Sequence, residues 1–538
     1  MNLFQKISNI QIGSPHKVFG WTSLFVLFVF SLYQGFQINI RKVPTGDEGL
    51  WIEKVTSLEK NRDYHTRLYY RFWSPIDKKE YHHSIMAPLY PVLASLIPGS
   101  WEQAFLKLKI LSLMFWICNG ILIRFILIRA GLGPALTLVG VLVYCLTPLQ
   151  LEYGLAGYPM LLFQFFVLLI AFFFIKYQNL NLSQAGLLGF ISGLSLLGRQ
   201  ETLWLIPGII FSIIFFKRAS LPGLRAVGLF LLVLILVNLP WEIVNILNRE
   251  QSLVGKATQF VFGDKMEAGE FMLSGASSPA LTLFGLFKNF IKNILIQSAA
   301  ISRLPVISWV FPFIPFTFMQ RAWPSFRIFS IATLALFIVF ICYMQFNPYD
   351  DNYLRYYLPV LPLVILFGCI GISEILKLIN SYPIKRFFIV FIVFILFVDQ
   401  FEYLYNHIHP VLKKKYHNDS QHVQSMEIVN YIKNHVGPNE SILASVGPHQ
   451  YIGYFQRSTA IIPRARFQEI FDFADRFNAR YFWLERATFT SPYPSIKREA
   501  LCPFWKWADS TLVEIKKPDF LIPLIATREQ IFYRIDNP

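Results

Sequence analysis

The chain has 538 residues, of which 54% are hydrophobic, 17% are aromatic and only 15% are charged. Soluble domains carry about a quarter charged residues, so this composition excludes an ordinary soluble protein. The net charge of +16 comes from basic residues spread between apolar runs, which favours anionic lipid over nucleic acid as their partner. Four of the five cysteines lie in apolar runs and Cys502 stands alone, so their spacing indicates neither a metal site nor a disulfide framework.

Apolar runs long enough to cross a bilayer recur over the first 405 residues. The first is followed by Arg41 and Lys42 without a small-residue cleavage site, so we interpret it as a retained span rather than a signal peptide. A later run, 187–216, is interrupted by Gly198-Arg199-Gln200-Glu201 and predicts two short spans that meet at a polar break. Hydropathy predicts about eleven spans: 20–38, 106–127, 133–149, 159–176, the two halves of 187–216, 224–243, 304–319, 328–346, 354–373 and 387–404.

Lysine and arginine residues in the short loops predict the orientation, because cytoplasmic loops carry an excess of them. These residues, such as Lys217 and Lys385, fall on one side if the N-terminus is cytoplasmic. The opposite side then holds two large loops, 39–105 and 244–303, together with the tail. The basic cluster Lys413-Lys414-Lys415 disagrees with this orientation.

The tail alternates helix-like and strand-like patterns, which is typical of a small α/β domain. We therefore predict a mostly α fold, in which a polytopic transmembrane bundle (1–405) precedes a small extracytoplasmic α/β domain (406–538). The expected location is a bacterial inner or plasma membrane, with the protein crossing it many times. Within the tail we predict helices at 426–436 and 467–477, and strands at 441–446, 481–484, 510–515 and 530–535.

Polar side chains gather at the outer ends of the predicted spans. Asp47 and Glu48 follow the first span, and ionisable groups at membrane depth are functional candidates by default. The alternative is a solvated helix start, where acids suit the helix dipole. The other candidates are His82 and His83 in the first loop, Glu152 and Tyr158 before the fourth span, Arg199 and Glu201 at the polar break, and Arg355 at the tenth span.

This set of residues suits an anionic lipid head group. Guanidinium binds phosphate through two parallel hydrogen bonds, and a nearby carboxylate can take a proton from an attacking hydroxyl. Structural alternatives stay open at this stage. Arg199 and Glu201 are also compatible with an internal ion pair, and Arg355 with a snorkelling anchor. His82 and His83 are compatible with idle positions at the membrane interface, and Glu152 with an exposed loop acid.

Four segments resemble those of the GT-C glycosyltransferases, the multi-span class that uses polyprenyl-phosphate-linked sugars. The layout of about 1–405 is similar to protein O-mannosyltransferases and lipid A aminoarabinose transferases. The latter carry an acid–Lys pair where this chain has Ile85 and Met86. The four segments are Asp47-Glu48, at the place of the family's catalytic acid; Ala87-Pro88-Leu89-Tyr90-Pro91, like its Pro-Pro-Leu-Tyr segment; the Gly-rich span 189–201 ending near Arg199; and Arg355-Tyr356-Tyr357-Leu358-Pro359, like its Arg-Tyr-Leu-Leu-Pro segment.

The resemblance implies an inverting transferase whose site faces away from the cytoplasm. A sugar would pass from a polyprenyl phosphate to a hydroxyl of a lipid, glycan or protein, without a cofactor or an evident metal cluster. Asp47 would be the general base and Glu48 a positioning group, while Arg355 and Arg199 would stabilise the leaving phosphate. The remaining polar candidates would contact substrate. The alternatives are a transporter or flippase of an anionic lipid and a non-catalytic lipid-binding scaffold; we find no repeat of the kind that transporters often show.

Overall fold

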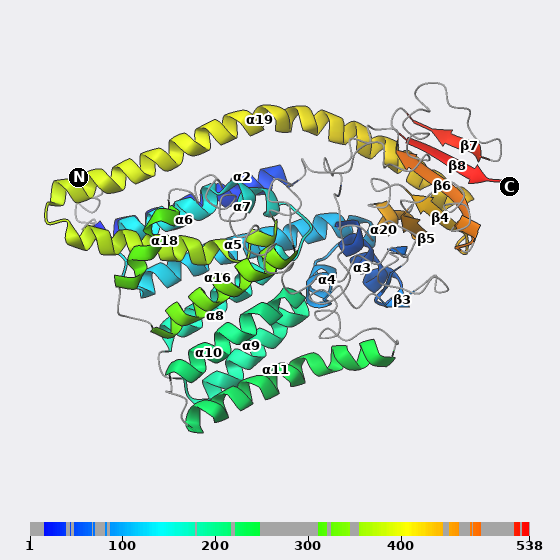
Figure 1. Ribbon diagram of the computed structural model, residues 1–538. Coiled ribbons are helices and arrows are strands. Elements are labelled where there is room, and N and C mark those ends of the chain that lie inside the picture. The colour runs from blue at the N-terminus through cyan, green and yellow to red at the C-terminus, as the bar shows by residue number, and fades with distance from the viewer. Residues whose placement is uncertain are drawn as a thin grey trace, which may run out of the picture.

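The computed structural model describes residues 15–38, 44, 48–66, 68–69, 81–82, 87–177, 180–216, 221–247, 310–319, 324–344, 355–444, 451–461, 474–475, 477–485, 521–527 and 530–536. Within these residues, a bundle of apolar helices lies beside a small sheet (Figure 1). The long helix α19 (Tyr382–His435) runs from the far end of the bundle to the sheet.

The apolar runs form helices where hydropathy predicts them. Three described helices are long and apolar enough to cross a membrane by length and composition: Trp101–Arg129, Leu221–Leu247 and Leu361–Leu378. The mostly helical fold is confirmed, while the number of crossings and their direction stay predictions. Besides α19, the described bundle contains α2 (Pro15–Gln37), α5 (Ala104–Arg129), α6 (Pro134–Leu146), α8 (Met160–Lys176), α9 (Leu182–Gly198), α10 (Leu205–Phe216), α11 (Leu221–Leu247), η3 (Phe311–Met319), α16 (Pro324–Met344) and α18 (Leu361–Leu378).

The predicted eighth span, 304–319, is described only from residue 310. It forms the 3₁₀ helix η3 and not an α-helix. Pro315 lies inside this helix and Pro312 near its start. Proline has no N–H to donate and its ring clashes with the preceding turn, which disfavours regular α-helical hydrogen bonding here.

Helices α9 and α11 pack closely because glycines face the contact. A Cβ added at Gly189 would lie 2.4 Å from the Phe230 carbonyl oxygen, and one at Gly193 would lie 2.8 Å from the Val237 Cβ. Two small residues four apart let helix backbones approach closely, a common arrangement in membranes. The Gly-rich character of the 189–201 segment therefore has a packing reason.

The C-terminal part forms a mixed six-stranded sheet in the order β2-β5-β4-β6-β8-β7. Strand β4 pairs in parallel with β5 and β6, while β8 pairs antiparallel with β6 and β7. The strands predicted at 441–446, 481–484 and 530–535 are confirmed; most of 467–477 and all of 510–515 lie outside the described residues. The strands are β4 (Ser441–Ala444), β5 (Ser458–Ile461), β6 (Ala479–Glu485), β7 (Leu521–Ala526), β8 (Gln530–Ile535) and β2 (Leu68–Tyr69).

Two features connect this sheet to the helical part. Helix α19 continues without interruption through the expected boundary at residue 405 and includes the helix predicted at 426–436. The edge strand β2 belongs to the first large loop, 39–105, and pairs in parallel with β5. The first loop and the tail therefore build one sheet together.

Candidate active site

Helix α3 (Glu48–Lys60) lies between the helical bundle and the sheet (Figure 1). It packs against α4 (Leu89–Ser95), α5 and the short helix α20 (Ile452–Phe455) of the tail. Although α3 belongs to the predicted loop 39–105, Glu48, Glu53 and Lys54 are all buried. Helix α3 thus places charged side chains in a buried part of the molecule.

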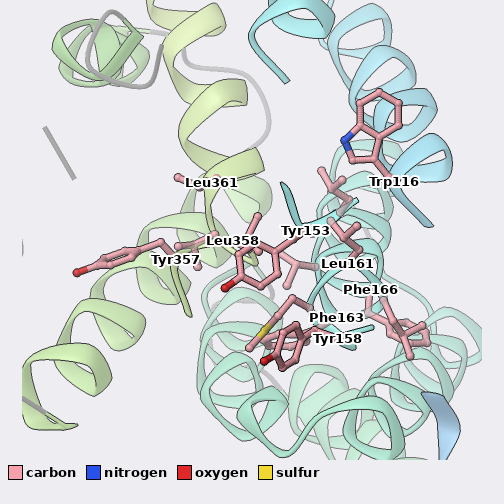
Figure 2. Close-up of a cluster of buried hydrophobic side chains, with 14 of the residues drawn as sticks. Trp116, Tyr153, Tyr158, Leu161, Phe163, Phe166, Tyr357, Leu358 and Leu361 are labelled. Carbon is pink, nitrogen blue, oxygen red and sulfur yellow. The ribbon is translucent and has the colours of Figure 1, made fainter. Parts of the chain in front are cut away.

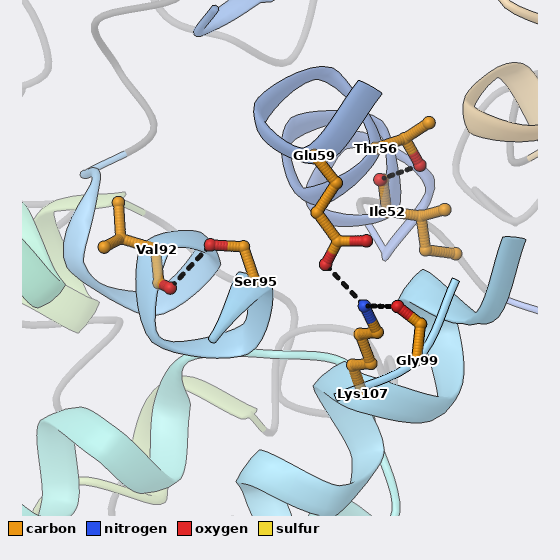
Figure 3. A network of polar contacts seen from close by, with 7 residues as sticks. All are labelled: Ile52, Thr56, Glu59, Val92, Ser95, Gly99 and Lys107. Carbon is orange, nitrogen blue, oxygen red and sulfur yellow. Dashed lines mark hydrogen bonds and ion pairs between the residues drawn. The ribbon is translucent and has the colours of Figure 1, made fainter. Parts of the chain in front are cut away.

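Lysine side chains fix the position of α3. The buried Lys54 Nζ donates to the Tyr64 carbonyl oxygen at 2.6 Å and lies 4.4 Å from the centre of the Tyr64 ring. At the other end of the helix, Lys107 Nζ of α5 donates to Glu59 Oε1 at 2.6 Å and to the Gly99 carbonyl oxygen at 2.8 Å (Figure 3). Hydrogen bonds that involve an ionised partner are stronger than neutral ones, so these contacts hold α3 firmly.

Glu48 holds the loop between α7 (Pro148–Tyr153) and α8. The Gly157 N–H donates to Glu48 Oε1 at 2.6 Å. The carbonyl oxygen of the same peptide unit, that of Ala156, accepts from the Ser112 hydroxyl at 2.6 Å. Because Ser112 gives its proton to Ala156, it accepts from the Tyr90 hydroxyl, which lies 2.8 Å away. Both polar atoms of the Ala156–Gly157 peptide are therefore fixed, one by Glu48 and one by Ser112.

Two phenols lie within the electrostatic reach of Glu48. Burial, and to a smaller extent the negative charge of Glu48, raises the pKa of Tyr90 and Tyr454 above the ordinary 10.0. Desolvation disfavours the phenolate, and a nearby negative charge disfavours it further. Both side chains are therefore neutral hydrogen-bond donors at physiological pH. Tyr454 comes from α20, so the tail contributes to the surroundings of Glu48.

The first turns of α8 contact two other segments that the sequence singled out, the one after Arg355 and the one before Arg199. The Gln164 amide donates to the Leu358 carbonyl oxygen at 2.6 Å and accepts from the Asn119 amide at 2.9 Å. Leu358 follows η4 (Arg355–Tyr357), and Figure 2 shows it in one cluster of buried hydrophobic side chains with Leu161 and Phe163 of α8. A Cβ added at Gly198, which precedes Arg199, would lie 3.3 Å from Leu162.

Contacts from the Glu48 side chain, from Gly198 and from Leu358 thus reach the loop before α8 and its first turns. Gly157 lies in the loop before α8, and Gln164 lies in the second turn of that helix. Glu48, Gly198 and Leu358, which are distant in sequence, therefore each contact the segment 157–164.

The polar break predicted between two short helices is confirmed. Helix α9 ends at Gly198, and the 3₁₀ helix η2 (Gln200–Trp204) leads into α10. Arg199 binds Glu201 through both carboxylate oxygens, with Nε donating to Oε2 at 2.8 Å. The Ser195 and Thr202 hydroxyls lie 2.7 Å apart across the same turn. The ion pair considered as an alternative from the sequence is thus present.

The structure describes only some of the other candidate residues from the sequence, and these differ in burial. Tyr158 is buried, with its ring 5.8 Å from that of Tyr153, whereas Glu152 on α7 is exposed. Strand β3 (Tyr81–His82) pairs its His82 backbone with that of His65 in β1 (His65–Thr66). Asp47, His83 and the side chains of His82 and Arg355 lie outside the described residues. In the described ranges, no group of three or more His, Cys, Asp or Glu could hold a metal ion.

Three residues of this region were not predicted from the sequence. Tyr90 lies within the 87–91 segment, where its aromatic ring alone gave no reason to single it out. Ser112 is a polar residue within the apolar run of α5, and that mismatch could have indicated a buried hydrogen bond. Tyr454 carries no local sequence pattern that connects it with Glu48, because only the tertiary contact of α20 with α3 brings the two together.

No protein-family model and no curated protein sequence matches the chain. Solved structures match it in fold. The crystal structure of ArnT from Cupriavidus metallidurans bound to undecaprenyl phosphate matches with a TM-score of 0.53 and 12% identity, over 96% of this chain and 99% of that chain; the apo state gives the same values. The oligosaccharyltransferase of Archaeoglobus fulgidus in complex with Zn and sulfate gives 0.52 and 11%, over 86% of this chain and 68% of that chain.

These likenesses extend over almost the whole chain, and at such low identity they concern the fold. The chain shares its fold with ArnT and with the oligosaccharyltransferase of Archaeoglobus fulgidus. The apolar helices agree with an integral membrane protein.

Proposed function

We propose that this protein transfers a sugar, with inversion, from a polyprenyl-phosphate donor to an acceptor hydroxyl at the outer face of the membrane. The GT-C fold supports membrane glycosyl transfer. Undecaprenyl phosphate is bound in the ArnT structure that matches 96% of the chain, which supports a lipid phosphate as the donor's leaving group. The acceptor is a lipid, glycan or protein.

The observation that carries the proposal is the convergence at the start of α8. Glu48 binds the loop that enters this helix, and Gln164 binds the carbonyl oxygen of Leu358 shortly after Arg355. A base and a phosphate-binding arginine must act on opposite sides of one anomeric carbon, so they have to meet at one place. No local pattern predicts that Glu48 and Leu358, more than 300 positions apart, both contact the segment 157–164, and these two contacts support the proposal.

In this proposal, Asp47 is the general base and Glu48 fixes its neighbour. The acceptor hydroxyl gives its proton to the Asp47 carboxylate while its oxygen attacks the anomeric carbon. The bond from that carbon to the phosphate oxygen breaks, and its electron pair remains on the phosphate. Glu48 anchors the first turn of α3 through Gly157, which would hold Asp47 in a constant direction.

Arg355 and Arg199 are the proposed partners of the leaving phosphate. A guanidinium can donate two parallel hydrogen bonds to phosphate and neutralise the charge that grows as the bond breaks. Because Arg199 already binds Glu201, its positive charge is partly compensated. We therefore assign the larger share to Arg355, with His82, His83, Glu152, Tyr158 and Glu201 as candidate contacts to the sugar or acceptor.

The test uses purified protein in liposomes. The donor is the polyprenyl-phosphate-sugar fraction of host cells labelled with ¹⁴C-glucose, and the acceptor is the membrane fraction of a strain that lacks the protein. Asp47→Asn should lower transfer by about 10²–10⁴-fold, the usual contribution of a general base. Arg355→Lys should raise the donor concentration for half-maximal rate, since a lysine cannot reproduce the two-pronged contact.

A different outcome would favour the rival function. Wild-type protein that forms no labelled product, yet moves labelled lipid between leaflets, is a flippase and not a transferase. Full transfer by both Asp47→Asn and Glu48→Gln would mean that the acid pair is only a helix start.

A further inference from the structure

One edge of the Arg199 guanidinium has no protein acceptor within the part of the chain that the structure describes. A guanidinium carries five N–H donors. Arg199 uses two of them, on Nε and Nη2, and both go to the carboxylate of Glu201. Of the donors that remain, one on Nη1 and one on Nη2 point in the same direction along the opposite edge. Two parallel N–H groups of this kind can bind two oxygen atoms of one phosphate.

The turn that carries Arg199 is held by its backbone. The Arg199 N–H donates to the Ser195 carbonyl oxygen at 2.8 Å, and the Arg199 carbonyl oxygen accepts the Thr202 N–H at 3.1 Å. The preceding residue, Gly198, lies against α8, since an added Cβ there would be 3.3 Å from Leu162. The open edge therefore belongs to a side chain whose backbone is fixed beside α8.

Both side chains of the pair reach solvent, although most of their surface is covered. The exposed fraction is 14% for the Arg199 side chain and 11% for that of Glu201. Partly buried charges are screened by salt much less than exposed ones. A negative ligand at the open edge is therefore attracted by Arg199 and, from across the guanidinium, repelled by Glu201. Each further negative charge on the ligand increases both effects.

The two lipid phosphates of the proposed reaction differ in this charge. The sugar donor is a phosphodiester with a single negative charge. The polyprenyl phosphate that leaves is a monoester, and phosphate monoesters carry about −1.5 to −2 at pH 7. An arginine alone would bind this product more tightly than the donor, because it attracts the larger charge more strongly. A product held in this way would occupy the site that the next donor needs.

We propose that Glu201 reduces the preference of Arg199 for the more highly charged product, so that the polyprenyl phosphate is released after transfer. The proposal rests on the transferase function proposed above and makes Glu201 a specificity-determining residue for that reaction. Among the candidate contacts named there, Glu201 then acts on the phosphate, through Arg199, and not on the sugar or the acceptor. The ion pair distinguishes a phosphate monoester from a phosphodiester.

Equilibrium binding to the purified protein in detergent tests the inference. The two probes are undecaprenyl phosphate, a monoester, and its monomethyl ester, a phosphodiester, both at about pH 8 and thus above the second phosphate pKa of roughly 6. Glu201→Gln keeps an oxygen that accepts from Arg199 and removes the charge. We expect the Kd of the diester to fall about fivefold and that of the monoester about 25-fold, since unit charges a few ångström apart in water interact by about fivefold per ligand charge.

Glu374→Gln in α18 is the matched control. The Glu374 carboxylate is 10% exposed and accepts from Lys377 Nζ at 2.5 Å, so this variant also removes the charge of a poorly exposed, paired acid. Both Kd values should stay as in wild type. Glu201→Asp, which keeps the charge, should leave the ratio of the two Kd values unchanged.

The transfer assay gives a second readout. Relative to the donor half-saturation, undecaprenyl phosphate should inhibit Glu201→Gln at a lower concentration than it inhibits wild type. Equal changes of both Kd values in Glu201→Gln, or no change, would overturn the inference, because Glu201 would then serve only to hold Arg199, while the transferase function would stand. Wild-type protein that binds both probes but forms no labelled product refutes the transferase function, and with it the role in product release.

Discussion

Glu48 gives the sharpest test of how the proposed site is built. Its carboxylate accepts the Gly157 N–H, so its role can be separated from that of a base by choice of substitution. Glu48→Gln keeps a side-chain oxygen that can accept the same N–H. Glu48→Ala removes the acceptor and leaves the Gly157 N–H without this partner. Neither Gln nor Ala can act as a base.

The magnitude follows from the hydrogen bond. A bond to a charged group contributes about 1.5–3 kcal/mol and a neutral one about 0.5–1.5 kcal/mol, so Glu48→Gln loses roughly 1 kcal/mol. A buried donor left unsatisfied costs about 1–3 kcal/mol in Glu48→Ala. Since about 1.4 kcal/mol corresponds to a tenfold change, we expect transfer to fall about 5-fold in the Gln variant and roughly 5- to 150-fold in the Ala variant.

The assay is transfer of labelled sugar in liposomes, with thermal unfolding of each variant in detergent measured alongside. The order of activity should be wild type, then Glu48→Gln, then Glu48→Ala, and the loss of stability should follow the same order. A Glu48→Gln variant that is as inactive as Glu48→Ala, yet as thermally stable as wild type, would refute the positioning role of Glu48. In that case the carboxylate of Glu48 takes part in the chemistry itself.

Three further predictions concern the ion pair, the helix packing and the orientation. Arg199→Gln alone should unfold at a lower temperature than the double variant with Glu201→Gln, because it leaves a poorly solvated carboxylate without its partner; a double variant less stable than the single one would contradict this. Gly189→Ala should cost about 1–3 kcal/mol by overpacking against Phe230, whereas Gly228→Ala, with no atom within 4 Å of the added Cβ, should be neutral or stabilising in the same unfolding measurement. Protease added to spheroplasts should cleave the tail, and a tail cleaved only after the membrane is opened would contradict the predicted outer location.

The sequence predicted the helices well because the feature that defines them is local. A run of apolar residues of sufficient length forms a helix in a bilayer whatever its neighbours are, since every backbone group must be satisfied within the segment. The break at 198–201 was also predictable, because four consecutive small or polar residues interrupt the run. The strands at 441–444, 479–485 and 530–535 followed from local alternation and β-propensity.

Other features of the fold depend on contacts between distant segments. The continuity of α19 through residue 405 crosses a boundary that composition alone placed there. Strand β2 has only two residues, too few for a sequence pattern, and it exists because the edge of the C-terminal sheet offers it hydrogen-bond partners. Such pairing cannot be read from either segment alone.

For the candidate site, the sequence by itself determined the residue types: an acid pair after the first span, an Arg–Glu pair at a polar break and an arginine before a late span. Only the tertiary structure decided their arrangement. It turned Glu48 into an acceptor for Gly157, paired Arg199 with Glu201 and placed Tyr454 of the tail near Glu48. The physical reason is the sequence separation over which each feature is determined. Hydropathy depends on neighbouring residues along the chain. A buried carboxylate, in contrast, requires hydrogen-bond partners, and the folded chain supplies one to Glu48 from more than a hundred positions away.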